Sequence, residues 1–135
     1  MATVKIYTPD TMCPPGSPYE QIAQVRGSEY VFIAGQVAVD GSGNLVGDGN
    51  IEAQCERVFA NIELALHAAG AGWQNVVEFT SYLVRREDIA PFRDYRTRVF
   101  PDMFANGAYP PSTLLIVSGL ASPKYLLEVK ATAAI

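Results

Sequence analysis

Two neighbouring segments near the end of the chain carry the side chains best suited to chemistry. The first, residues 109–120, is led by two prolines and carries a hydroxyl at Ser112, and the second, residues 127–133, carries the carboxylate of Glu128. A carboxylate in a cleft can orient and deprotonate an attacking water molecule. The other interpretation of Glu128 is a solvated carboxylate on a half-buried strand. The residues alone leave both interpretations open.

Several common kinds of active site lack their parts in this sequence. His67 is the only histidine, so neither a multi-histidine metal site nor a Ser-His-Asp triad can be assembled. Residues 40–44 resemble the start of a calcium loop, but Leu45 and Ile51 stand where that pattern requires Gly and Glu, so a turn is predicted. Neither glycine-rich phosphate-binding pattern occurs. We therefore expect no metal and no cofactor.

Composition and charge limit the classes of partner. Lys and Arg total 10 against 14 Asp and Glu, and the resulting net charge of −4 opposes binding to the phosphates of nucleic acid. No apolar run approaches the roughly 20 residues that a membrane helix needs. Cys13 and Cys55 by themselves form neither a disulfide framework nor a zinc site. We expect a cytoplasmic protein with no nucleic-acid partner and no membrane partner.

The strands that must position these side chains are indicated by apolar and alternating runs. A proline-rich loop over residues 8–18 leads through residues 19–26 to a buried strand over residues 30–34, and Gly27-Ser28 suggests a tight hairpin between them. Three further strands are predicted, over residues 76–84, 112–118 and 125–134.

Two amphipathic helices are predicted where the period of the apolar residues lengthens to about 3.6. The first begins at Asn50, whose side chain can cap it, and ends at Gly70. The second follows the charged turn at residues 85–88, and Pro101 is expected to break it or force a restart. The apolar stripes are Ile51, Cys55, Val58, Phe59, Ile62, Leu66 and Ala69 in the first helix and Phe92, Tyr95, Val99 and Met103 in the second.

The element order β-β(-β)-α-β-α-β-β predicts a single α+β domain over residues 1–135, with a mixed sheet and two helices on one face. In the last strand the apolar residues alternate with Glu128, Lys130 and Thr132, so the other face of the sheet is partly polar. We expect that face to be covered by other copies of the chain, with polar clefts between them.

The sequence resembles the Rid (RidA/YjgF) family over nearly its whole length. The landmarks occur in the family's order and spacing; they are Gly16-Ser17-Pro18-Tyr19, Phe32-Ile33-Ala34-Gly35-Gln36, Gln54, Asn61-Ile62, Ala68-Ala69-Gly70, Val76-Val77, Tyr82-Leu83, Tyr109-Pro110, Leu120 and Leu127-Glu128-Val129. The resemblance implies a chorismate-mutase-like (YjgF-like) fold, a homotrimer with clefts between subunits, and hydrolysis of reactive enamines or imines such as 2-aminoacrylate. It also implies that Glu128 and Tyr19 are catalytic residues of the cleft.

Several positions depart from the pattern of the family's deaminases. Ser112 stands where the resemblance implies a carboxylate-binding arginine, and a hydroxyl cannot supply a bidentate, charge-assisted pair. Leu114 replaces a residue that is often cysteine, and Ala34 replaces a serine. The predicted ligand-binding residues are Ser112, Arg93, Ala34, Gln36, Thr113 and Leu114.

Arg93 falls where the resemblance implies an asparagine in the cleft. A guanidinium entering from the helix would restore the positive charge lost at Ser112 and would bind an anionic ligand. The other interpretation places Arg93, Arg96 and Arg98 together on a solvated outer face of the helix. Both interpretations remain open.

Two functions therefore remain. The first is an imine or enamine hydrolase acting on a substrate other than the usual small amino-acid imines, with Glu128 orienting water and backbone amides near Ser112 and Ala34 polarising the substrate. The second is a non-catalytic trimer that binds a small ligand and has lost the deaminase chemistry. A ribonuclease function is disfavoured by the acidic charge and by the lack of a histidine acid–base pair.

Overall fold

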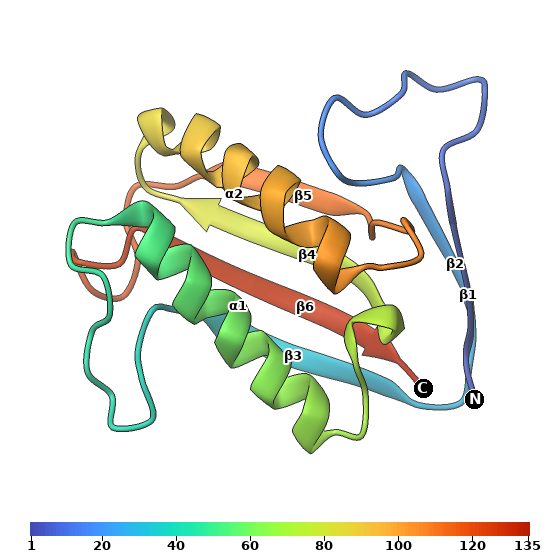
Figure 1. Ribbon diagram of the computed structural model, residues 1–135, viewed down its shortest axis with the longest axis horizontal. Helices are drawn as coiled ribbons and strands as arrows, with labels where there is room; N and C mark the ends of the chain where they lie inside the picture. Colours follow the sequence, from blue (N-terminus) through green and yellow to red (C-terminus); the bar gives the residue numbers. More distant parts are fainter.

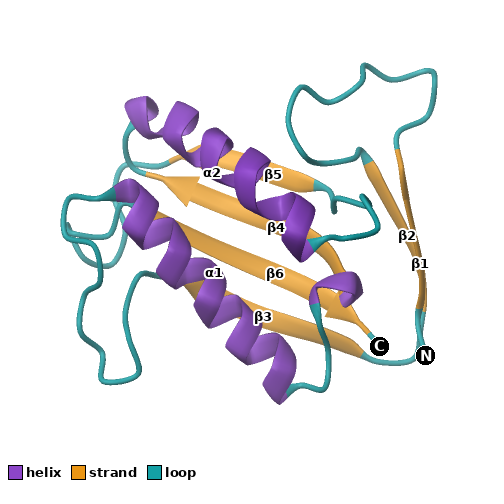
Figure 2. Cartoon of the chain, in the orientation of Figure 1, coloured by secondary structure: helices purple, strands orange, loops and turns teal.

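The computed structural model describes residues 1–135 and shows a sheet with two helices lying across one of its faces (Figures 1 and 2). The strand order in this sheet is β3-β6-β4-β5. The strands are β3 (Tyr30–Gln36), β4 (Val76–Leu83), β5 (Ser112–Ile116) and β6 (Leu127–Ala134). The helices are α1 (Ile51–Ala68) and α2 (Ile89–Met103), with short 3-10 turns at Trp73–Asn75 and Arg86–Asp88. The predicted α+β fold with both helices on one face is confirmed.

The connection from β4 through α2 to β5 determines which residues of β5 face the helices. β4 and β5 run parallel, whereas the other pairs of the sheet are antiparallel. A parallel pair requires a crossover that covers one face of the sheet, and α2 provides it. Phe79 is paired with Ser112, and Phe79 is buried beneath the helices, so Ser112 lies on the same face as α2.

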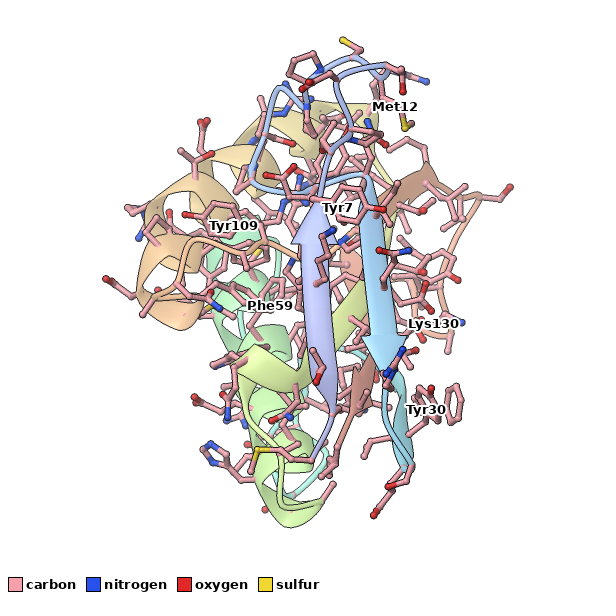
Figure 3. The ribbon with its side chains drawn as sticks, turned by 90° about the vertical axis from the view of Figure 1, so that its right-hand side faces the viewer. Tyr7, Met12, Tyr30, Phe59, Tyr109 and Lys130 are labelled. Atoms are coloured by element: carbon pink, nitrogen blue, oxygen red, sulfur yellow. The ribbon has the colours of Figure 1, made fainter.

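A separate two-stranded ribbon is formed by β1 (Thr3–Tyr7) and β2 (Ile22–Arg26), seen side by side in Figure 3. The predicted hairpin at Gly27-Ser28 is wrong, because β2 pairs with β1 and β3 pairs with β6. The chain leaves the ribbon at this point, since Glu29 exchanges two backbone hydrogen bonds with Ile135, of 3.3 and 2.9 Å. The end of the chain thus takes the place that a hairpin partner would have occupied.

The first helix begins and ends where the sequence predicts. The side chain of Asn50 accepts a hydrogen bond of 3.0 Å from the backbone of Ala53. Gly70 has φ of +74°, and Ala71 donates a backbone hydrogen bond of 2.8 Å to Leu66 that closes the end of the helix. The predicted stripe is buried against the sheet from Cys55 to Leu66.

The second helix differs from its prediction, because α2 continues through Pro101 to Met103. Proline removes one backbone donor, but it stands in the last turn and little helix remains after it to be disrupted. Phe104 still donates its backbone N–H to the carbonyl of Phe100 at 2.8 Å.

The core between the helices and the sheet is rich in aromatic rings centred on Phe59. Its ring centroid lies 5.9 Å from that of Phe79 on β4, and 5.8 and 5.6 Å from those of Tyr95 and Phe100 on α2. Burial raises the pKa of the Cys55 thiol to about 12, so this side chain remains protonated and packs as a small apolar residue. The rings therefore join both helices to the sheet.

The other face of the sheet remains open in the single chain. Leu127, Val129 and Ala131 of β6 are buried under the helices, so the intervening residues face outward. Phe32 on β3 is 80% exposed and Leu115 on β5 is 42% exposed. Of the helices, none combines the length and apolar composition that crossing a membrane requires.

Candidate ligand-binding site

A cavity of about 300 Å³ opens where α2, the start of β5 and the loop between β1 and β2 meet. We call it the arginine pocket, because two guanidinium groups are the only charged groups in its wall. Its lining residues are Gly16, Ser17, Tyr19, Arg93, Arg96, Ser112 and Leu114. Four of the predicted site residues are therefore brought together here: Tyr19, Arg93, Ser112 and Leu114.

The strand register explains why Ser112 and Leu114 both reach this pocket. They are the first and third residues of β5, and alternate residues of a strand share one face. Their partners on β4 are Phe79 and Ser81, both buried under the helices.

Tyr19 is held in place by the loop that carries it. Glu20, the next residue, donates a backbone hydrogen bond of 3.1 Å to the carbonyl of Tyr109, just before β5. The backbone N–H of Gln21 donates to the hydroxyl of Thr8 at 3.0 Å, which ties together the two ends of the loop. Prolines within the loop limit its conformational freedom. The loop thus forms a fixed wall of the pocket.

Arg96 is the functional candidate that the sequence interpretation missed. The interpretation that places Arg96 on a solvated face is wrong, because this residue is only 5% exposed. Residues three and four apart lie on one side of a helix, and Arg96 is four residues from both Phe92 and Phe100, which are buried. That spacing could have indicated its direction. Arg98, by contrast, is exposed and forms an ion pair with Glu52.

Arg96 takes part in none of the ion pairs of the chain, and no acidic residue lines the pocket. Its Nη1 atom donates a hydrogen bond of 3.3 Å to the hydroxyl of Ser112, and its Cζ atom lies 4.6 Å from the centroid of the Phe92 ring. Its Nε atom is buried and has no hydrogen-bond partner. Burial, together with the positive charge of Arg93, lowers the pKa of the Arg96 guanidinium to about 10, so the group is still charged at neutral pH.

Arg93 lies one turn before Arg96 on α2 and is exposed at the mouth of the pocket. The ion pairs of the chain join Arg85 to Asp88, Arg98 to Glu52 and Lys124 to Asp48. Neither guanidinium of the pocket therefore has a carboxylate partner in the chain.

Glu128 lies in a second hollow, of about 400 Å³, on the open face of the sheet. We call it the glutamate groove; it is lined by Gly35, Tyr82, Val117, Gly119, Leu120, Ala121, Glu128 and Lys130. The carboxylate packs directly over Gly35, where a Cβ atom would collide with it. Glycine at this position thus makes room for the Glu128 side chain.

The predicted catalytic pair is therefore divided within one chain, because Tyr19 lines the arginine pocket and Glu128 the glutamate groove. Thr113 lies in a small neighbouring hollow that Tyr19 also lines. Ala34 is exposed near the end of β3, and its carbonyl accepts a hydrogen bond of 3.0 Å from the side chain of Gln36. Neither Thr113 nor Ala34 lines the arginine pocket or the glutamate groove.

Comparison with known proteins identifies the family. The family model described as endoribonuclease L-PSP matches residues 11–135. A RutC family protein of Pyrococcus abyssi is 30% identical over 133 residues, which cover 98% of each chain. The crystal structure of YyfB from Yersinia pestis, described as a protein of unknown function of the Rid family, is 31% identical, with a TM-score of 0.85 and 98% coverage of each chain. The chain belongs to the Rid family.

Some Rid proteins similar to this chain are named for an activity. A mouse protein named 2-iminobutanoate/2-iminopropanoate deaminase is 33% identical over 99 residues, which cover 72% of this chain and 71% of the mouse protein. The likeness to solved Rid structures confirms the YjgF-like fold predicted from the landmarks. No group of three or more His, Cys, Asp or Glu side chains in the chain is arranged to hold a metal ion.

Proposed function

We propose that this Rid protein hydrolyses an imine or enamine bearing a carboxylate, in clefts formed between the subunits of a homotrimer. The observation that carries the proposal is the division of the site. The arginine pocket has cationic groups but no carboxylate to act as a base, and the glutamate groove has a carboxylate on the open face of the sheet. In a closed trimer, the groove of one subunit would meet the pocket of the next.

The exposed apolar residues of the open face support such an assembly. A phenylalanine that is 80% exposed on a sheet face would be stabilised by a partner that removes it from water. The same face carries Glu128, so covering it with another subunit also encloses the groove.

The chemistry assigned to the cleft needs only groups of this chain and water. Glu128 takes a proton from water as the water oxygen bonds to the imine carbon, and the C=N electron pair moves to nitrogen. Glu128 then returns that proton to nitrogen, which gives a tetrahedral amino alcohol. Glu128 next transfers the proton of the new hydroxyl to nitrogen as the C–N bond breaks, so that ammonia leaves and the carbonyl forms. The hydroxyl of Tyr19 donates a hydrogen bond to the nitrogen or to the new oxygen. The guanidinium groups of the arginine pocket bind the carboxylate of the substrate.

The alternative is a trimer that binds the same anion without hydrolysing it. The arginine pocket of a single chain has no carboxylate that could act as a base. If the assembly does not bring Glu128 of another subunit to the pocket, the pocket can bind the anion but cannot hydrolyse it. Both functions share a ligand class, so the reaction itself must separate them.

The test is an assay in which an anionic imine is generated in situ and the appearance of the ketoacid is followed. Both 2-aminoacrylate and a bulkier imine should be compared, since the proposed substrate differs from the small amino-acid imines. Wild type should accelerate hydrolysis of the bulkier imine, and Glu128→Gln should lower that rate by on the order of 10²–10⁴. Glu56→Gln, at an exposed position of α1, is the matched control and should retain the wild-type rate.

The result also decides between the two functions. No acceleration by wild type of any anionic imine, together with binding of the ketoacid, would establish the non-catalytic alternative. Equal rates for wild type and Glu128→Gln would remove Glu128 from the mechanism.

A further inference from the structure

The buried guanidinium of Arg96 lacks the partner that such a group requires. An unpaired charge is costly to bury, and buried arginines are almost always paired with acidic groups. The Phe92 ring beneath the guanidinium offsets part of this cost. A guanidinium has five N–H donors, yet Arg96 makes a single hydrogen bond, of 3.3 Å, in the chain. This length exceeds that of a charge-assisted bond. The group therefore has donors left for an anion.

We propose that Arg96 and Ser112 together bind the carboxylate of the substrate at the floor of the arginine pocket, and that Arg93 binds a second anionic group at its mouth. The preferred ligand is therefore a small dicarboxylate. This inference rests on the proposed function for the identity of the site, and it adds the anchoring residues and the ligand class.

Ser112 contributes through its hydroxyl, which both accepts and donates. Its oxygen accepts the hydrogen bond from Nη1 of Arg96, so its own proton is free to be donated to a carboxylate in the pocket. The serine thus links the guanidinium on α2 to the ligand. Arg96 on α2 then supplies the positive charge that is absent at Ser112 on β5.

The proposal that the ligand carries a second negative charge follows from the electrostatics of the pocket. Arg93 and Arg96 are the only charged residues in its wall, and both are cationic. Each charge disfavours the other, which is why Arg93 contributes to the lowered pKa of Arg96. A dianion relieves this repulsion at both positions, whereas a monoanion leaves one guanidinium unpaired.

Binding without turnover provides the test. Isothermal titration calorimetry compares the affinity of the intact protein for pyruvate, a monocarboxylate, with its affinity for 2-oxoglutarate, a dicarboxylate. The difference is the affinity contributed by the second carboxylate. Wild type should bind 2-oxoglutarate roughly tenfold more tightly than pyruvate, a ratio typical of one added charge-assisted hydrogen bond. Arg93→Met should abolish this preference, because the second carboxylate of 2-oxoglutarate then has no guanidinium to bind it.

Arg96→Met should weaken both ligands by roughly tenfold or more, and Ser112→Ala should weaken both by a smaller factor. Arg96→Met also serves as a test of a purely structural role. Replacing a buried, unpaired charge by an apolar side chain of similar length should leave the melting temperature equal or higher. If Arg96 only stabilised the fold, the melting temperature would fall and binding would be retained.

The outcomes separate this inference from the proposed function. Tight, Arg96-dependent binding of 2-oxoglutarate without imine hydrolysis would support the inference and contradict the proposed catalysis. Imine hydrolysis that persists in Arg96→Met, with equal affinity for both ligands in wild type, would overturn the inference and leave the catalysis intact.

Discussion

At the scale of single residues, the position of the Glu128 carboxylate depends on the absence of a side chain at Gly35. A Cβ atom there would collide with the carboxylate and with the carbon that bears it. The end of a glutamate side chain can move aside at little cost to the fold. The contact therefore affects where the proposed base points more than whether the chain folds.

Gly35→Ala should accordingly remain folded while the proposed hydrolysis slows by up to roughly a hundredfold, because the base is displaced from its position. The measurement is the imine hydrolysis rate together with a thermal melt. Gly41→Ala is the matched control, since nothing lies within 4 Å of a Cβ atom at that position. Full activity in Gly35→Ala would show that the carboxylate needs no fixed position.

Residue identity was easier to predict from the sequence than residue direction. Tyr19, Arg93 and Ser112 were singled out and do share a pocket, and Glu128 was singled out and lies in a hollow of its own. Arg96 was considered only as part of a charge run on a solvated face, which was one of the two interpretations left open. Its direction is decided by the buried rings one turn away on each side, a spacing that outweighs its charge.

At the scale of elements, a buried glutamine connects α1 to two loops. The side chain of Gln54 donates to the carbonyls of Gly47 and Lys124 at 3.1 and 3.0 Å, and accepts from the backbone of Leu126 at 2.9 Å. The loops on either side of this helix end are thereby fixed to each other, and β6 begins immediately after Leu126.

Gln54→Ala should lower the free energy of unfolding by roughly 2–4 kcal/mol, because it removes three hydrogen bonds at a fully buried side chain and leaves the buried Leu126 N–H without its partner. Urea denaturation measures the change. Glu56→Ala, exposed on the same helix, should change stability by less than about 0.5 kcal/mol. Equal denaturation midpoints for the two variants would mean that water replaces the lost hydrogen bonds.

The order and type of the elements could be predicted because their apolar periods are clear, whereas connections that depend on distant partners could not. The supposed hairpin at Gly27-Ser28 fails because Ile135, more than a hundred residues away, pairs with Glu29. In β4, a bulge between Val76 and Glu78 buries Val76, although strict alternation from the buried Phe79 would place it on the outward face. Neither effect leaves a local signal in the sequence.

At the scale of the whole molecule, the open face of the sheet decides whether the two hollows can act together. Phe32 is the most exposed large apolar residue within an element of the chain, at 80%. Its neighbours on β3 carry the chain to Gly35 and the glutamate groove. A subunit contact made by this face would therefore also bring the glutamate groove against the partner subunit.

Phe32→Asp should yield a folded monomer that has lost the proposed hydrolysis, because a charge on this face would have to be buried in the assembly. Light scattering should give three times the chain mass of 14.6 kDa for wild type and the chain mass itself for the variant. Leu64→Asp is the control, since Leu64 is 63% exposed on α1, away from the sheet. A monomeric wild type that hydrolyses imines would refute the shared cleft.

The wall of the arginine pocket formed by residues 8–21 begins and ends at one strand pair, Tyr7 with Ile22. We therefore expect an exchanged segment to keep the register of the ribbon, provided that it retains Tyr19 and the backbone hydrogen bond from residue 20 to Tyr109. Grafting the corresponding loop from another relative would change the shape of the cavity while leaving its guanidinium groups on α2. We therefore expect selectivity for ligand size to depend on this loop and affinity for negative charge to depend on α2, so that each can be altered separately.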